Sequence, residues 1–100
     1  MATTTKALAR TAAATSSTTL YTVPSSTTTV VTNIVVTNSA TSAATFTITL
    51  DSVDLFKDAA LAANSTAIFD LKQVLATTKI IAGLASATTV RFHISGVEIA

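Results

Sequence analysis

The feature that most constrains this chain is a stretch of forty consecutive residues, 11–50, without a single Asp, Glu, Lys, Arg or His. Thr, Ser, Ala, Val and Ile make up most of this stretch, and its β-branched residues favour strands over helices. A soluble monomer usually distributes charge over its exposed faces. The stretch therefore predicts β-strands whose outer surface is partly covered by another protein.

Strict alternation of apolar and polar side chains marks two strands. In the first, Phe46, Ile48 and Leu50 alternate with threonines. In the second, Thr89–Ile94, Arg91 and His93 are predicted to point outward, and the residues predicted to point inward are Val90, Phe92 and Ile94. A period of two is typical of a half-buried strand. Further strands are predicted at residues 18–23, 27–38, 66–72 and 73–81, the last around a tight turn at 76–78.

The same alternation predicts which face of each strand is buried. Within residues 27–38, the buried face is predicted to hold Val30, Thr32, Ile34 and Val36. Near the end of the chain, a bulge at Ser95 and Gly96 is predicted to keep Val97 and Ile99 on the apolar face. Residues 83–87 are predicted to form a loop.

Two segments allow more than one structure. Asp51 or Ser52 could cap a helix over Asp51–Asn64, but Val53 also begins an alternating pattern. We interpret this segment as a short strand followed by a loop, because a single helix would have to find its own cover on a sandwich. Residues 1–15 are small and weakly patterned, so they predict either a flexible arm or a first edge strand. With little apolar mass beyond Leu8, this segment is expected to serve attachment more than folding.

Taken together, the segments predict an all-β protein. Seven or eight short strands with turns every 8–12 residues are typical of an antiparallel β-sandwich, jelly-roll-like or immunoglobulin-like. One hundred residues fit a single domain. We therefore expect a sandwich over residues 16–100, preceded by the arm or edge strand of residues 1–15.

Composition argues against several classes of function. The chain has no Cys, so no thiolate site is possible. Its single His, His93, is predicted to point outward beside Arg91 and is interpreted as an exposed or interface residue of a strand rather than a catalytic base. Its six Lys and Arg are scattered, whereas nucleic-acid binding needs clustered cations. No apolar segment approaches the ~20 residues of a membrane span, and no apolar stretch of a signal peptide follows Lys6 and Arg10. We expect a non-enzymatic protein without catalytic residues, cofactor, metal, nucleic-acid or membrane partner.

Contacts with partner proteins are the remaining expectation. Lys6 and Arg10 are the only charges before Asp51 and could pair with acidic groups on a neighbour. Tyr21 could cover an interface with its ring while its hydroxyl stays wet, although a plain sheet-edge role is equally compatible. The full set of candidate partner contacts is Lys6, Leu8, Arg10, Tyr21, Arg91 and His93.

Four runs carry a resemblance to a known group of proteins. They are LYTVPSSTTTVVTNIVVTN (20–38), SAATFTITL (42–50), LAANSTAIFDL (61–71) and HISGVEIA (93–100). Together they resemble small virion proteins of tailed bacteriophages, which are β-sandwich subunits of heads, necks or tails. The chain departs from the expected pattern at Thr77 and Thr78, where a Gly-Asp pair would be anticipated.

The resemblance implies a structural subunit located in the virion and made in the cytoplasm of a host bacterium. Its partners would be further copies of itself, as a homo-oligomer, and other virion proteins. A place at the neck or tail is favoured, because residues 1–15 qualify only weakly as an arm that grips a capsid. The alternatives are a capsid-surface decoration protein and, in a different class, a small glycan- or ligand-binding β-module.

Overall fold

The computed structural model describes residues 2–100, and these residues form eight strands and no helix. The strands are β1 (Thr3–Ala12), β2 (Thr18–Thr22), β3 (Thr28–Asn38), β4 (Ala44–Leu50), β5 (Val53–Leu61), β6 (Ser65–Leu75), β7 (Ile80–Ala85) and β8 (Val90–Ile99). Within this part of the chain there is accordingly no helix long and apolar enough to cross a membrane. The predicted all-β class is confirmed.

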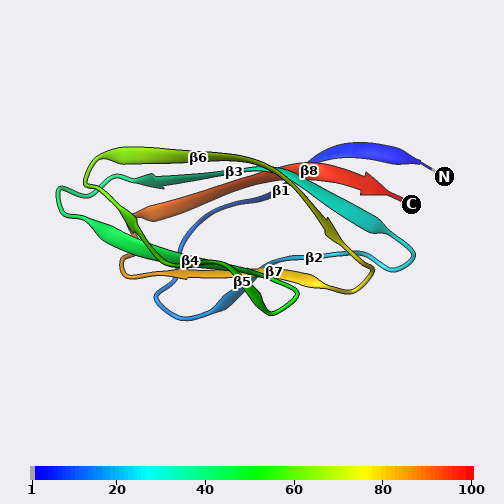
Figure 1. The fold of residues 1–100 in the computed structure, drawn as a ribbon, viewed down its shortest axis with the longest axis horizontal. Coiled ribbons are helices and arrows are strands. Elements are labelled where there is room, and N and C mark those ends of the chain that lie inside the picture. Colours follow the sequence, from blue (N-terminus) through cyan, green and yellow to red (C-terminus); the bar gives the residue numbers. More distant parts are fainter. Residues whose placement is uncertain (1) are drawn as a thin grey trace.

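The strands form two four-stranded antiparallel sheets that pack face to face (Figure 1). Sheet A has the order β1-β8-β3-β6, and sheet B has the order β2-β7-β4-β5. The chain changes sheet at every connection except the one between β4 and β5. This order is that of an eight-stranded jelly roll, so the jelly-roll form of the predicted sandwich is the one observed. The molecule is elongated, 46 × 21 × 17 Å, and both termini lie at one end (Figure 1).

The core lies between the two sheets. Its largest fully buried side chains include Phe46 from sheet B and Phe92 from sheet A, whose rings are 6.4 Å apart at 66°. Phe56 and Phe69, both partly buried, pack against Phe46 at 5.6 and 6.2 Å. The predicted inward faces of residues 45–50 and 89–94 are confirmed, because all their aliphatic and aromatic members are buried.

Asp51 and Ser52 form a two-residue hairpin turn between β4 and β5. Both residues have positive φ, 53° and 62°, as a type I′ turn requires, and this turn matches the twist of antiparallel strands. The strand interpretation of this segment is therefore correct, although the strand continues to Leu61 where a loop was expected. Strand β5 is irregular: Asp58 has a φ of 46°, and its N–H donates to the hydroxyl of Thr47 at 3.0 Å.

A line of irregular pairing crosses the whole of sheet A, and we call it the bulge line. Relative to β8, strands β1 and β3 each carry an extra residue, Leu8 and Thr32. Relative to β3, strand β6 also carries an extra residue, within the pair Leu71 and Lys72. In strand β8 itself, inward and outward side chains alternate without interruption through Ser95.

The bulge line corrects two predictions about buried faces. In β3 the extra residue reverses the alternation, so Thr29 and Val31 point inward while Thr32 is exposed. In β8 the predicted bulge does not exist, so Val97 and Ile99 lie on the outer face and Glu98 points inward. The β3 prediction extended a local period across a residue that is inserted in that strand, and the β8 prediction placed in β8 a bulge that instead lies in the neighbouring strands.

Gly96 explains why the irregularity falls at this level. A Cβ atom at this position would collide with the carbonyl oxygen of Val30 and would lie 2.8 Å from Cδ1 of Leu8. Only a residue without a side chain allows β3 and the Leu8 side chain to approach β8 so closely.

Residues 83–87 differ from the prediction, and the described part of residues 1–15 adopts one of the two structures that the sequence allowed. Gly83, Leu84 and Ala85 belong to β7, so the loop predicted at residues 83–87 is confined to the residues after Ala85. Residues 3–12 form edge strand β1, paired with β8 along its length, which is one of the two alternatives for residues 1–15. Met1 lies outside the described residues. Because β1 is a full strand with Leu8 buried, its removal would cost the fold more than the arm interpretation anticipated.

We expect Gly96→Ala to lower the free energy of unfolding by about 1–3 kcal/mol, because the added methyl group must displace the backbone of β3. Urea unfolding measures this change. Ser95→Ala is the matched control and should have little effect, because the side-chain hydroxyl of Ser95 makes no hydrogen bond among the described residues. Equal stability of the two variants would show that the close approach is not sterically tight.

The turn between β6 and β7 provides a second test. Thr78 has a φ of 67°, a left-handed conformation that costs a β-branched residue about 1–2 kcal/mol. We expect Thr78→Gly to raise the free energy of unfolding by about 0.5–1 kcal/mol, since the flexibility of glycine in the unfolded chain offsets part of the gain. Thr77→Gly should instead destabilise the protein, because it removes the hydrogen bond from Thr77 to the carbonyl of Pro24.

Candidate functional site

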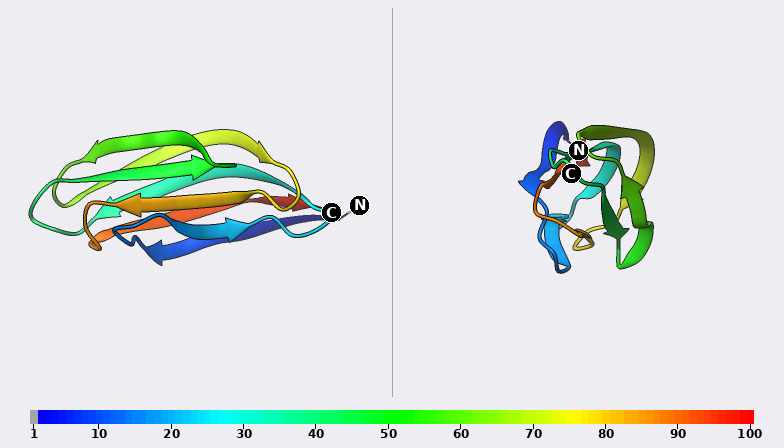
Figure 2. Two further views of the ribbon diagram at one scale, coloured as in Figure 1. Left: turned by 90° about the horizontal axis from the view of Figure 1, so that it is seen from below. Right: turned by 90° about the vertical axis from the view of Figure 1, so that its left-hand side faces the viewer.

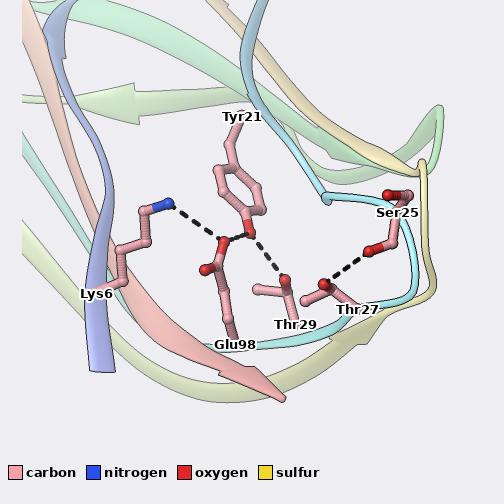
Figure 3. A network of polar contacts seen from close by, with 6 residues as sticks. All are labelled: Lys6, Tyr21, Ser25, Thr27, Thr29 and Glu98. Carbon is pink, nitrogen blue, oxygen red and sulfur yellow. Dashed lines mark hydrogen bonds and ion pairs between the residues drawn. The ribbon is translucent and has the colours of Figure 1, made fainter. Parts of the chain in front are cut away.

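The best-connected cluster of polar side chains joins the two sheets at the side where β1 and β2 lie (Figure 3). Tyr21 extends from β2 in sheet B, and its hydroxyl contacts Glu98 on β8 and Thr29 on β3. Lys6 on β1 reaches the same Glu98 oxygen, with its Nζ 3.4 Å from Oε2. Four strands from both sheets thus contribute to one cluster, in which Tyr21 and Lys6 contact the Glu98 carboxylate and Thr29 contacts Tyr21.

The direction of each hydrogen bond follows from the chemistry of the groups. A carboxylate can only accept, so the Tyr21 hydroxyl gives its single proton to Glu98. The hydroxyl of Thr29, 2.9 Å away, must then donate to the Tyr21 oxygen. The ammonium of Lys6 donates to Glu98 from the solvent side, where Lys6 remains 47% exposed. Every polar group of the cluster therefore has a partner.

The pKa values of Tyr21 and Glu98 are shifted in opposite directions, both away from neutral pH. Burial, reinforced by the hydrogen bond to Glu98, raises the pKa of the Tyr21 hydroxyl, and the contact from Thr29 opposes this only partly. The hydrogen bond from Tyr21 lowers the pKa of Glu98, burial opposes this to a smaller extent, and Lys6 lowers the pKa further. The hydrogen bond from Tyr21 on β2 to Glu98 on β8 therefore joins the two sheets with an ionised acceptor and a neutral donor at neutral pH.

Of the predicted contact residues, Arg10 and His93 are brought together. They are opposite each other in the β1–β8 register, and the row continues across sheet A through Val35 on β3 to Ile68 on β6. Arg91 lies two residues along β8 on the same face, where its guanidinium donates to the hydroxyl of Ser39 at 3.0 Å. The outer face of sheet A thus carries cations toward β1 and aliphatic side chains toward β6.

The other predicted contacts lie elsewhere. Leu8 and Tyr21 are only 7% and 8% exposed, and they pack within the core of their own chain. Their side chains are therefore not part of the surface that a partner would meet. Lys6 is exposed, but it extends toward Glu98 rather than toward Arg10. Tyr21 lies on the edge strand β2, the sheet-edge position considered for it, and its hydroxyl contacts Thr29 and Glu98 of its own chain.

Two shallow depressions follow the bulge line on the outer face of sheet A. One is lined by Thr32 and by Asp70, Leu71 and Lys72 of β6. The other extends from Lys6 and Arg10 across to Ser95 and Val97. Among residues 2–100, no three His, Asp or Glu side chains lie close enough together to hold a metal ion.

Sequence reasoning missed Glu98 and Thr29 as members of the polar cluster. Tyr21 and Glu98 are 77 residues apart, and no local pattern links them. The one available signal was the alternation in β8: continued without a bulge, it would have placed Glu98 on the inward face, where a buried carboxylate needs partners.

Comparison with known proteins identifies no matching family model, no similar curated protein and no similar solved structure.

The cluster makes stability depend on pH. The pKa of Glu98 is lower in the folded protein than its ordinary value of 4.5, so its contribution is present above that pH and is lost as pH falls through the folded pKa. We expect Glu98→Gln to be less stable than the wild type at neutral pH and to lose less stability on acidification. Urea midpoints between about pH 3 and pH 7 measure this.

Asp54→Asn, which removes an exposed carboxyl on β5, is the control and should follow the wild-type acid profile. If Glu98→Gln and the wild type lost stability in parallel, the Glu98 interactions would contribute nothing to folding.

Proposed function

We propose that this protein is a non-enzymatic structural subunit of a tailed-phage virion, assembled at the neck or tail through repeated protein–protein contacts. The observation that carries the proposal is that the fold leaves large aliphatic side chains exposed. Three large aliphatic side chains, Val53, Ile68 and Val74, are about two-thirds exposed in a protein with few charges. Exposed apolar groups that gather in one part of the surface mark contact sites, and these three all lie on the edge strands β5 and β6.

The fold supports the proposal by analogy. Jelly rolls are common in viral capsid proteins and also in lectins, although a fold alone does not define a function. The sequence resemblance to small virion proteins of tailed bacteriophages points to the first of these classes. Residues 3–12 are paired with β8 as part of sheet A, so they are not free to grip a capsid. This favours the neck or tail over decoration of the head.

A glycan-binding module is the alternative from another class. Sugar sites commonly present an aromatic ring to the flat face of the sugar. Here Tyr21 is buried, and the four Phe rings pack with one another in and around the core. The described surface therefore lacks the aromatic platform that would favour this alternative.

Mass spectrometry of purified particles tests the proposal. We expect peptides of this protein at a stoichiometric copy number that stays constant through successive gradient purifications. A non-structural protein of the same infected cells is the control, and it should decrease with each step. Loss of this protein along with the control would refute a virion role.

Imaging of labelled particles tests the position. Because both termini lie at one end of the long axis (Figure 1), a gold label on a terminal tag marks that end without touching the sheets. We expect label at the neck or tail. Label spread over the icosahedral shell would refute this position and would support the decoration alternative.

A further inference from the structure

The two long sides of the sandwich are chemically different. Viewed down the long axis, β1 and β2 lie on one side and β5 and β6 on the opposite side (Figure 2). We call these the β1/β2 side and the β5/β6 side. Each consists of the two edge strands of the sheets, so each presents backbone groups without a partner strand in this chain.

Exposed apolar side chains are confined to one side. All three large hydrophobic residues that the described chain leaves exposed belong to β5 or β6: Val53 on β5, and Ile68 and Val74 on β6, at 67–68% exposure. The opposite edge strand β1 exposes mainly Thr and Ala. One side therefore offers projecting aliphatic groups, and the other offers a flat surface of small residues.

Charge differs between the sides in a complementary way. Strands β1 and β2 contain Lys6 and Arg10 and no acidic residue, a net charge of +2. Strands β5 and β6 contain three Asp and two Lys, a net charge of −1. Two such sides attract each other, whereas two copies of the same side would place like charges together.

The strand directions also match. Each sheet has four strands, all antiparallel, so its first and last strands run in opposite directions. A second copy placed beside the first in the same orientation would bring its β1 antiparallel to β6 of the first. The two strands are nearly equal in length, ten and eleven residues, and the bulge line reaches both of them.

We propose that β6 of one copy pairs with β1 of a second copy, so that sheet A continues from subunit to subunit around an axis parallel to the strands. The inference rests on the proposed function, because it supplies the contact by which the subunit would repeat. Head-to-tail contacts of this kind close into rings when the rotation between copies allows it.

If each row of paired residues across sheet A continues at the same height into the next copy, the register predicts which residues meet. Arg10 belongs to the row that ends at Ile68, and Asp70 lies two residues along β6 on the same outer face. Arg10 of the second copy would lay its aliphatic stem on Ile68 and extend its guanidinium to Asp70, a diagonal within reach of long side chains. Thr5, in the row of Val74, would cover that residue.

The available area is sufficient for a stable contact. A side 46 Å long and 17–21 Å wide provides on the order of 800 Å², about what each partner contributes to a specific interface of standard size.

Charge exchange at this contact provides the test. We expect the wild type to associate in analytical ultracentrifugation, and Arg10→Asp or Asp70→Arg alone to raise the midpoint concentration of association about tenfold or more. An equimolar mixture of the two variants should associate again, because alternating copies restore an opposite-charge pair at every contact. Arg91→Asp, the same charge change at the centre of sheet A, is the matched control and should associate like the wild type.

Hydrogen exchange of the assembled protein locates the contact. Backbone amides on the free edges of β1 and β6 should become protected on association, while the outer face of sheet B is unchanged. Circular dichroism verifies that each variant is folded, and Asp70→Arg reports on the contact even if Arg10→Asp does not fold.

A wild type that stays monomeric at high concentration would overturn the inference, as would Arg91→Asp disrupting association as strongly as Arg10→Asp, or protection that avoids β1 and β6. None of these results would alter the detection of the protein in purified particles. Conversely, absence from particles would refute the virion role while leaving a measured β1–β6 contact intact.

Discussion

The close approach of three strands around Gly96 sets the geometry of sheet A. Without a side chain at this position, β8 passes beside the Val30 carbonyl and beneath Leu8, and both neighbouring strands accommodate the approach by inserting one residue. Each insertion reverses the direction of the side chains that follow it. Leu8 and Val31 consequently reach the core, whereas β8 has no insertion and its regular alternation directs Glu98 inward to Tyr21.

The Tyr21–Glu98 cluster depends on this arrangement and in turn connects the sheets. A sandwich held only by apolar contacts can slide, because the hydrophobic effect has no direction. A hydrogen bond from β2 to β8, with Thr29 and Lys6 completing the cluster, fixes the sheets relative to each other beside the open edge of β1. The core near Phe46 and Phe92 and this cluster therefore have different roles, one supplying burial and the other alignment.

The distribution of charge follows the positions of the strands. The uncharged residues 11–50 include β3 and β4, which lie inside their sheets and have both edges paired, and also the edge strand β2. Strands with both edges paired do not need charge to prevent unwanted pairing, whereas edge strands do. Strands β1, β5 and β6 are edge strands of this kind, and each of them carries charged residues. For β3 and β4 the lack of charge thus has an explanation within one chain, which does not extend to the uncharged edge strand β2. The proposed contact between copies rests instead on the edge strands, where charge and exposed aliphatic groups differ from one side to the other.

The sequence by itself determined the β class, most strands, and the inward faces of residues 45–50 and 89–94, because alternation along a strand is a local property. It also identified Arg10 and His93 as exposed or half-exposed polar groups, though not as neighbours. Only the tertiary structure decided which strands are edges, where the bulge line reverses a face, and that Glu98 meets Tyr21. These depend on partners distant in the chain. The same holds for Asp51 and Ser52, which suit a helix cap as well as a hairpin turn: pairing of β5 with β4 selects the turn, since a strand is stabilised by its neighbours and not by its own residues alone.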